Sequence, residues 1–228
     1  SSLESQFNAS DCLVHNPFGQ PTGAPVTLCR SGYSVGYSTT HKQPAWASYY
    51  LNADLVNRQI PRTEDFREDT GVPAPFRSTL EEYSGSGFDR GHIAEAAAVG
   101  FDQKSMSESF LLSNMSPQLP VFNRGGWAEL EEQIRECTNS RGDLLVVSGA
   151  VFQSPSPMRI NNLGPSIPDR FYKLVVKLSA PREAFAVSIK HEAFTLADLG
   201  GFVVSPDELE LQTGIDFLSG LADSEENS

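Results

Sequence analysis

The clearest hydrophobic pattern in the chain predicts a long helix. Apolar residues recur at intervals of three, four and three, at Trp127, Leu130, Ile134 and Cys137. This spacing gathers their side chains on one face of an α-helix. The predicted helix extends from about residue 124 to residue 138, and Gly142 lies just beyond its end. We expect Cys137 to be buried there as a small apolar side chain.

Further segments have the composition of β-strands. Residues 33–40 and 45–52 are rich in aromatic and β-branched side chains and flank the turn-forming sequence HKQP, which predicts a hairpin. Three apolar runs follow the long helix, separated by loops rich in Pro, Gly and Asn, and cover residues 143–152, 171–178 and 184–190. We expect all three runs to be strands.

Two shorter helices and a long loop complete the pattern. Residues 103–112 favour a short helix, and residues 205–218 favour a final helix with Ser205 as its cap and Pro206 in its first turn. Between residues 53 and 86, charged and turn-forming residues alternate and several prolines argue against a long helix. We expect a surface excursion there, and long loops of this kind are often functional.

This order of elements predicts an α+β fold with a central, mostly antiparallel sheet flanked by helices. A chain of 228 residues can bury one good hydrophobic core, and one domain is the simplest organisation. We therefore expect an irregular N-terminal extension over residues 1–30, a single domain over residues 31–220 and an acidic tail over residues 221–228. No apolar run approaches the ~20 residues that cross a bilayer, so no membrane contact is expected.

The charge of the chain is unevenly distributed. The formal net charge is -12, but the segment from His191 to Ser228 contains nine Asp or Glu and no Lys or Arg, which leaves the first 190 residues near -3 (17 bases against 20 acids). The acidic balance weakens the case for a nucleic-acid partner without excluding one, because a basic cleft can form locally.

The cysteines bear on the compartment. Three cysteines cannot all pair within one chain. Cys12 and Cys29 close a short loop in a Gly/Pro-rich region, which suits a disulfide in an exported protein, although two reduced thiols are the alternative. We expect a secreted or periplasmic protein, with an organellar location as the alternative.

Candidate chemistry lies in two places in the chain. Asp89 and Arg90 precede His92 on a turn that contains Gly91. About thirty residues later, Asn123 precedes the long helix, which carries Glu131 and Arg135 one turn apart, close enough to pair or to face a common cleft. Since residues 123 and 131 would be about 12 Å apart along a helix, both cannot bind one small cation directly. We expect Asn123 to bind it directly and Glu131 to act through water.

Hard oxygen ligands and retained waters suit Mg²⁺, and Mg²⁺ suits phosphodiester cleavage. In that reaction His92 would activate water, the metal would stabilise the leaving oxygen, and Arg62, Arg90 and Arg135 would bind phosphate oxygens. Each residue alone also has a simpler interpretation: His92 as a surface histidine beside an aspartate, Asn123 as a helix cap, and Glu131 with Arg135 as an exposed salt bridge. His15, His41 and His191 are interpreted as ordinary loop or strand-end residues.

Three blocks together resemble a known family. SGSGFDRGHIA (84–94), FLLSNMSPQ (110–118) and FNRGGWAELEEQIRE (122–136) are similar to the signature blocks of the DNA/RNA non-specific endonucleases, which belong to the ββα-metal (His-Me finger) superfamily. Weaker similarity extends to the Arg-bearing loop PRTEDFREDTGVP (61–73) and to the C-terminal helix. The resemblance covers roughly residues 30–220 and implies a ββα-metal active site.

The resemblance also implies roles for single residues. It makes His92 the general base, Asn123 the direct ligand of Mg²⁺ (with Mn²⁺ as a substitute) and Glu131 a residue that holds metal-bound water. Phosphate binding would fall to Arg62, Arg90 and Arg135, with Arg58 or Arg67 as alternatives to Arg62. Asp89 and Asn114 would contact and support the residues of the site without binding metal or substrate themselves. DNA and RNA are the implied substrates, and a homodimer and a protein inhibitor are further implied partners.

One position departs from the family pattern. The family usually has Pro or Ala three residues after the histidine, where this chain has Glu95. A carboxylate there could repel substrate, recruit a second cation, raise the pKa of His92 or point to solvent, and we expect the last or a mild indirect effect.

The sequence therefore favours a metal-dependent endonuclease that cuts DNA and RNA without strong sequence preference, because phosphate contacts do not read bases. The main alternative is a catalytically silent protein of the same fold that binds nucleic acid or another protein. A serine hydrolase is disfavoured because the chain lacks a G-x-S-x-G elbow.

Overall fold

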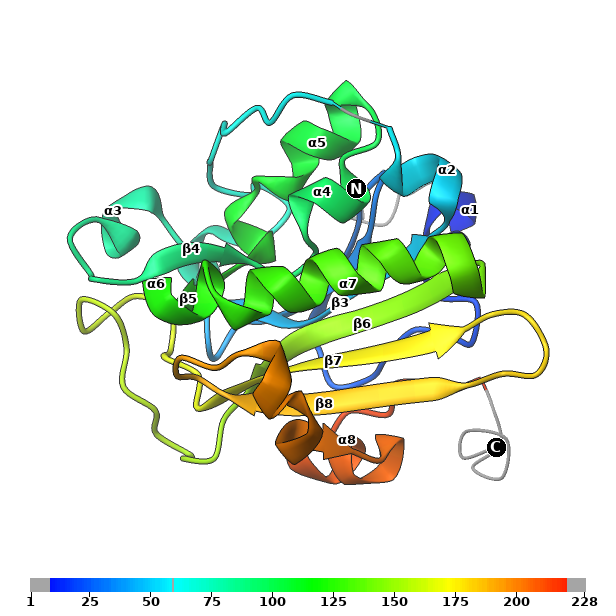
Figure 1. The fold of residues 1–228 in the computed structure, drawn as a ribbon. Coiled ribbons are helices and arrows are strands. Elements are labelled where there is room, and N and C mark those ends of the chain that lie inside the picture. The colour runs from blue at the N-terminus through cyan, green and yellow to red at the C-terminus, as the bar shows by residue number, and fades with distance from the viewer. Residues whose placement is uncertain (1–8, 59, 221–228) are drawn as a thin grey trace.

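Within residues 9–58 and 60–220, which the computed structural model describes, the chain forms an antiparallel sheet of seven strands (Figure 1). The order across the sheet is β1-β2-β3-β6-β7-β8-β9, so the hairpin of β2 and β3 joins the later strands through β6. The strand bounds are β1 Val26–Cys29, β2 Ser34–Ser38, β3 Gln43–Leu51, β6 Leu144–Val151, β7 Arg170–Lys177, β8 Ala184–Lys190 and β9 Val203–Val204.

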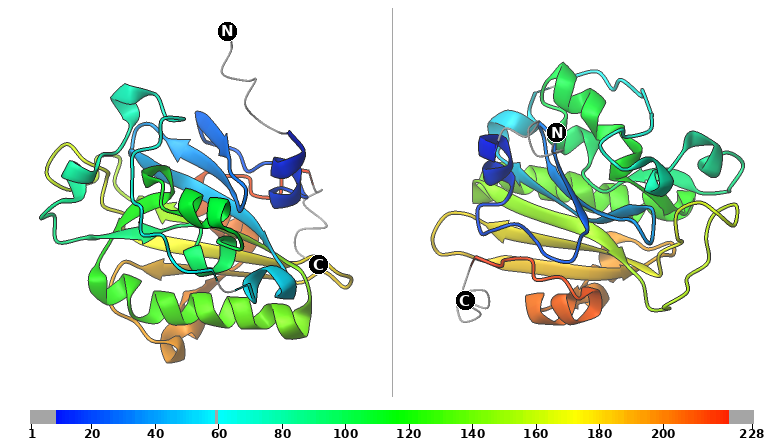
Figure 2. Two further views of the ribbon diagram at one scale, coloured as in Figure 1. Left: turned by 90° about the horizontal axis from the view of Figure 1, so that it is seen from above. Right: turned by 180° about the vertical axis from the view of Figure 1, so that it is seen from behind.

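Both faces of this sheet are buried. Successive side chains of a strand point to opposite faces, and in β6 Leu144 and Val146 join one hydrophobic cluster while Leu145 and Val147 join another. Helix α7 (Gly126–Arg141) covers the first face, and α8 (Pro206–Thr213) with the segment after it covers the second. The views in Figure 2 show α7 and α8 on opposite sides of the sheet. The α+β fold expected from the sequence is confirmed.

Helix α7 follows the predicted periodicity with one correction. Its buried side chains are Trp127, Leu130, Glu131, Ile134 and Thr138, whereas Cys137 is exposed. After Ile134 the next buried residue is Thr138, four positions later, and not Cys137, three positions later. A step of four keeps the side chain on the face of the helix that packs against the sheet. The expectation that Cys137 is buried is therefore wrong.

The remaining predicted elements form with small shifts in their ends. The short helix is α5 (Gln103–Ser109), and the three apolar runs are β6, β7 and β8. Ser205 caps α8 as expected, but the helix ends at Thr213 and does not reach residue 218. Gly214 has a φ of 70°, a left-handed conformation that terminates helices and that glycine adopts at little cost.

Residues 9–30 are more regular than the sequence indicates. Helix α1 (Ala9–His15) and the edge strand β1 both lie in this segment. A disulfide joins Cys12 of α1 to Cys29 of β1, with 5.6 Å between their Cα atoms. The segment is therefore built into the sheet instead of preceding it, although α1 is short and has no apolar periodicity that would have predicted it. The acidic tail over residues 221–228 lies outside the described residues.

A separate ribbon of β4 (Asp89–His92) and β5 (Met115–Gln118) lies on the same side of the main sheet as α7 (Figure 1). The other short helices surround it or occupy the loops: α2 Ala53–Val56, η2 Ala74–Phe76, α3 Leu80–Tyr83, α4 Ala96–Val99, η3 Leu112–Asn114, α6 Pro120–Asn123 and η4 Leu196–Phe202. In its described part, the segment from residue 53 to residue 86 is the expected excursion, with the single helical turns α2, η2 and α3 and an isolated β-bridge from Arg67 to Leu111. No helix in the described part of the chain is long and apolar enough to span a membrane.

Candidate active site on the β4–β5 ribbon

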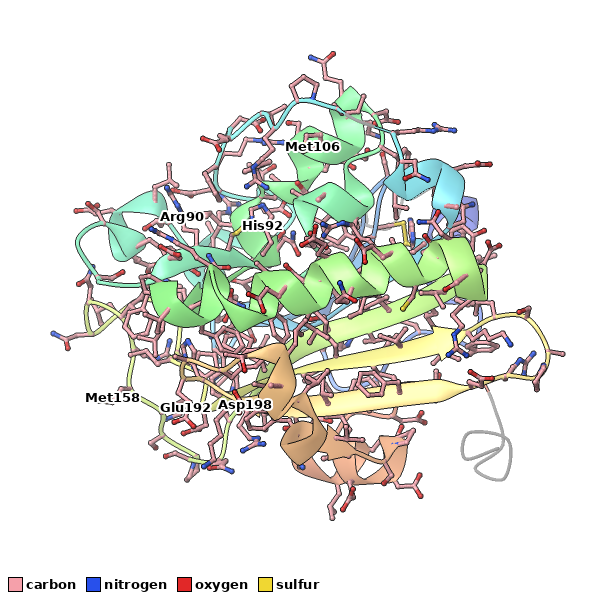
Figure 3. The ribbon with its side chains drawn as sticks, viewed as in Figure 1. Arg90, His92, Met106, Met158, Glu192 and Asp198 are labelled. Carbon is pink, nitrogen blue, oxygen red and sulfur yellow. A yellow bond between two sulfur atoms is a disulfide. The ribbon has the colours of Figure 1, made fainter. Side chains whose placement is uncertain are left out.

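Strand β4 presents Arg90 and His92 from alternate positions, so both side chains leave the same face of the ribbon. Figure 3 shows them above the N-terminal part of α7. The register pairs His92 with Met115 and Asp89 with Gln118. A Cβ atom at Gly91 would lie 2.1 Å from Gln118 Oε1 and 2.5 Å from Gln118 Cγ, so only glycine lets β5 approach this closely.

Two phenylalanine rings surround the imidazole of His92. The Phe110 ring meets it edge to face at 4.8 Å, and the Phe66 ring lies 5.8 Å away. Each ring also carries a guanidinium group: Arg62 lies over Phe110 at 5.0 Å and Arg90 over Phe66 at 4.1 Å. The excursion before β4 thus brings Arg62 and Phe66 to His92 from a distant part of the sequence.

These neighbours hold His92 in its neutral form. Burial lowers the pKa of His92 to about 3, and the positive charges of Arg62 and Arg90 contribute to the fall. The Nε2 atom is buried and has no hydrogen-bond partner. A neutral imidazole at pH 7 can accept a proton, so His92 has the charge state that a general base requires.

The structure separates Arg62 from its two alternatives. The guanidinium group of Arg67 donates to the carboxylate of Asp65 at 2.7 Å and to a backbone carbonyl of α5 at 3.0 Å. These contacts give Arg67 a structural role. Arg58 is exposed just after α2. The side chain of Arg62 is 51% exposed, stacks on Phe110 beside His92 and forms an exposed ion pair with Glu64 at 3.7 Å, so a ligand can reach it from solvent.

The amide of Asn123, the last residue of α6, is oriented by Asp89. Asn123 Nδ2 donates to Asp89 Oδ2 at 2.9 Å, and Arg124 donates two further hydrogen bonds to the same carboxylate, at 2.8 and 2.6 Å. Burial alone would raise the pKa of Asp89, but the hydrogen bonds from Arg124 and Asn123 lower it. Because a carboxylate only accepts hydrogen bonds, the amide nitrogen faces Asp89 and Oδ1 is turned away from it.

Glu131 and Arg135 take other partners instead of each other. Glu131 Oε1 lies 3.1 Å from the ammonium group of Lys173, a fully buried residue in the middle of β7. Arg135 forms an ion pair with Glu95, the residue before α4. The side chain of Glu95 is 15% exposed, so the expectation that it points to solvent is wrong.

Burial dominates the electrostatics of this cluster. It raises the pKa of Glu131 and of Glu95, against the opposing charges of Lys173 and Arg135. Burial would lower the pKa of Lys173. The electrostatic interactions with Tyr49, Glu131 and Glu95 outweigh this effect, so the pKa lies above its usual value. The cluster contains two carboxylates and two cations, so it is nearly balanced in charge.

Asn114 and His191 fix the backbone around the site. Asn114 is buried, accepts from the backbone N–H of Ala94 at 2.8 Å and donates to the carbonyls of Ala94 and Ser109 at 2.9 Å each, which ties the segment after His92 to the end of α5. His191 Nε2 accepts from the backbone N–H of Leu119 at 2.8 Å. Neither side chain has a spare group for chemistry, and the interpretation of His191 as a structural residue agrees with these contacts.

Sequence reasoning did not mark Phe66, Gln118 or Lys173. Gln118 is buried and neither of its amide atoms has a hydrogen-bond partner. Lys173 carried a usable signal, because a charge at the third position of the apolar run FYKLVVKL cannot reach solvent from a central strand. Phe66 carried none, since its position depends on how the excursion folds over α5.

The DRGH sequence of β4 lies in the first of the three sequence blocks described above, β5 lies in the second, and Asn123 with most of α7 lies in the third. The sequence profile of the family described as DNA/RNA non-specific endonuclease matches residues 13–224. This chain belongs to the DNA/RNA non-specific endonuclease family. It is thus a nuclease by descent, and the resemblance read from its sequence is confirmed.

Relatives with nuclease names cover most of the chain. A nuclease of Nostoc sp. is 32% identical over 92% of this chain and 82% of its own length. Nuclease C1 of Cunninghamella echinulata var. echinulata is 35% identical over 90% of this nuclease and 87% of its own length. Human mitochondrial endonuclease G is 34% identical over 70% of this chain, which corresponds to 57% of the human protein.

A solved structure extends the likeness to the fold. The crystal structure of the EndoG/EndoGI complex, described as showing the mechanism of EndoG inhibition, matches this nuclease with a TM-score of 0.85 and 26% identity, covering 92% of each chain. The sheet flanked by helices is therefore a shared architecture of the family.

Proposed function

We propose that this nuclease hydrolyses phosphodiester bonds of DNA and RNA without strong sequence preference, with His92 as the general base and a Mg²⁺ ion held by Asn123. The neutral imidazole between Arg62 and Arg90 is the observation that carries the proposal. A phosphodiester is an anion attacked by water, so its hydrolysis requires a base next to positive charge.

The residues present fit a hard divalent cation. Asn123 offers Oδ1 as an oxygen ligand, because its nitrogen is committed to Asp89. Glu131 would hold the cation through an intervening water. Within the described residues, no three His, Cys, Asp or Glu side chains gather to bind a cation together, so Asn123 would be its direct protein ligand. When bound, Mg²⁺ supplies Lewis-acid stabilisation of the leaving oxygen, and Mn²⁺ has the same preference for oxygen.

Nε2 of His92 is buried and has no hydrogen-bond partner in the structure. We assign the proton transfer from water to the imidazole as a whole, because a neutral ring accepts a proton at whichever nitrogen is unprotonated. The edge of Phe110 and the backbone ties made by Asn114 limit rotation of the ring. A base held in one orientation loses little entropy when it meets the attacking water.

Phosphate binding would be divided among the arginines. Arg62 and Arg90 are stacked on phenylalanine rings and would donate to phosphate oxygens, with Arg62 giving up its exposed ion pair with Glu64. Arg135 is held by Glu95 and would have to share its guanidinium group with the substrate. Since these contacts address phosphate, base identity would go unread.

The proposal is tested by substitution at the base. His92→Ala should abolish cleavage of supercoiled plasmid and of single-stranded RNA in Mg²⁺, and EDTA should do the same to the unchanged protein. His41→Ala is the matched control, because His41 stacks on Phe152 and bonds to Ser166 away from β4. Full activity of His92→Ala would remove His92 from its role. Tight binding of nucleic acid without cleavage by the unchanged protein would favour the silent binding protein instead.

Partners and compartment follow from the relatives as proposals. EndoG is described in complex with EndoGI, which supports a protein inhibitor as a partner of this nuclease. A homodimer stays a prediction. The disulfide between Cys12 and Cys29 supports export, whereas mitochondrial relatives support an organellar location.

A further inference from the structure

Lys173 is a fully buried lysine in the centre of the main sheet. It lies on β7 between Phe171 and Val175, whose side chains point to the same face, toward α7. Removing an ammonium group from water is costly, and an apolar side chain would fill this space without that cost. A charge in this position therefore calls for a reason other than stability.

The ammonium group of Lys173 is surrounded by one carboxylate, two hydroxyl groups and an aromatic ring. Lys173 Nζ lies 3.1 Å from Glu131 Oε1, 3.4 Å from the hydroxyl of Ser148 and 3.5 Å from the hydroxyl of Tyr49. The Ser148 hydroxyl donates its own hydrogen to the carbonyl of Tyr172, so its oxygen is free to accept. The ammonium group therefore donates two long hydrogen bonds to hydroxyl groups and forms an ion pair with the carboxylate of Glu131. The face of Trp127 lies 4.4 Å from Nζ and adds a cation–π contact.

Glu131 depends on Lys173 because Arg135 is engaged elsewhere. Arg135 lies one helical turn after Glu131 and would be its natural partner. Glu95 takes that guanidinium group instead. Among the described residues, Lys173 is the cation that pairs directly with Glu131.

We propose that Lys173 is a positioning residue of the active site, which holds the Glu131 carboxylate through Oε1 and so turns Oε2 toward the water that binds the metal. This rests on the proposed function, because it takes Glu131 as a residue that holds the cation through water. Lys173 itself touches neither substrate nor metal. It acts from β7, through its contact with Oε1 of the Glu131 carboxylate.

The test is a double-mutant cycle on the full chain. Lys173→Met, Glu131→Gln and the combination of both are compared with the unchanged protein for kcat on plasmid DNA, for Mn²⁺ binding by calorimetry and for thermal unfolding. Lys177→Met is the matched control, since Lys177 lies on the same strand and pairs with Glu183 at 3.9 Å away from the site. Lys173→Leu, which also removes the donor for Glu131, replaces Lys173→Met if that variant does not fold.

We expect Lys173→Met to lower kcat and to weaken Mn²⁺ binding by about tenfold each, the usual effect of losing a group that orients a metal-site ligand. In the Glu131→Gln background the same substitution should change kcat by less than about twofold, because Lys173 acts through Glu131. Equal losses in both backgrounds, or a Lys173→Met variant as active as Lys177→Met, would overturn the inference. The proposed function fails separately, if the unchanged protein shows no metal-dependent cleavage or if Glu131→Gln is fully active.

Discussion

Glu95 and Arg135 form an ion pair across the site, between the segment that follows β4 and the middle of α7. The side chain of Arg135 is 23% exposed and that of Glu95 is 15% exposed, so the pair is largely shielded from water. The carboxylate of Glu95 binds the guanidinium group of Arg135, to which the family resemblance assigns phosphate binding. If Arg135 binds phosphate as proposed, Glu95 competes with the substrate for it.

Replacing Glu95 by Ala, a residue usual in the family at this position, should strengthen substrate binding. The freed guanidinium group would meet phosphate without displacing a carboxylate, and we expect KM for DNA to fall on the order of fivefold, equivalent to ~1 kcal/mol. The free energy of unfolding should fall by about 2 kcal/mol, because Arg135 loses a shielded partner. Steady-state kinetics and urea unfolding measure the two effects.

Glu132→Ala is the control for the Glu95 substitution. It removes a negative charge, as Glu95→Ala does, but from an exposed position on α7, the helix that carries Arg135. If both variants show the same KM, the effect belongs to net charge and Glu95 does not compete for Arg135.

Removing Asp89 should weaken metal binding without touching the metal ligand. In Asp89→Ala the amide of Asn123 loses the acceptor that orients it. Loss of such an orienting partner reduces metal affinity or activity by about 10- to 100-fold. The Mg²⁺ concentration that gives half-maximal cleavage should rise within that range.

Arg124→Ala separates the two partners of Asp89. The side chain of Arg124 is 71% exposed, and its loss leaves the contact between Asn123 and Asp89 intact. We expect a change of less than about threefold in the Mg²⁺ requirement, in line with the small energies of exposed ion pairs. A loss as large as that of Asp89→Ala would show that the Arg124 contact is the one that matters.

The neutral His92 should make the fold sensitive to acid. Its pKa is about 3 in the folded protein, against about 6.5 in an unfolded chain. As the pH falls through 6.5, the imidazole of His92 binds a proton in the unfolded state but not in the folded state. The free energy of unfolding therefore decreases progressively down to pH 3. Between pH 7 and pH 5.5 this group alone removes ~1 kcal/mol from the free energy of unfolding.

Urea unfolding in EDTA at pH 7 and at pH 5.5 checks this loss. His92→Asn lacks the titrating group, and the contributions of all other residues cancel in the comparison. The variant should therefore lose about 1 kcal/mol less than the unchanged protein over this interval. Identical losses would contradict a depressed pKa at His92.

The sequence alone determined the scaffold and named the residues that we propose for the site. The apolar period of α7 and the runs that became β6, β7 and β8 are local patterns, which survive folding because each buries the face it presents. His92, Asn123 and Glu131 were found because their blocks have a recognisable order. The N-terminal helix α1 and strand β1 escaped notice, since short elements held by a disulfide need little periodicity of their own.

Only the tertiary structure decided which charges meet. The spacing of Glu131 and Arg135 predicted that they pair or face a common cleft, yet the buried face of α7 brings Lys173 to Glu131 and the segment before α4 brings Glu95 to Arg135. Phe66 reaches His92 in the same way, from a loop whose path no local pattern fixes. Periodicity shows which face of an element is buried. The partner on the other side of that interface is set by chain segments about 40 residues away, where packing and desolvation select among alternatives that the sequence leaves equal.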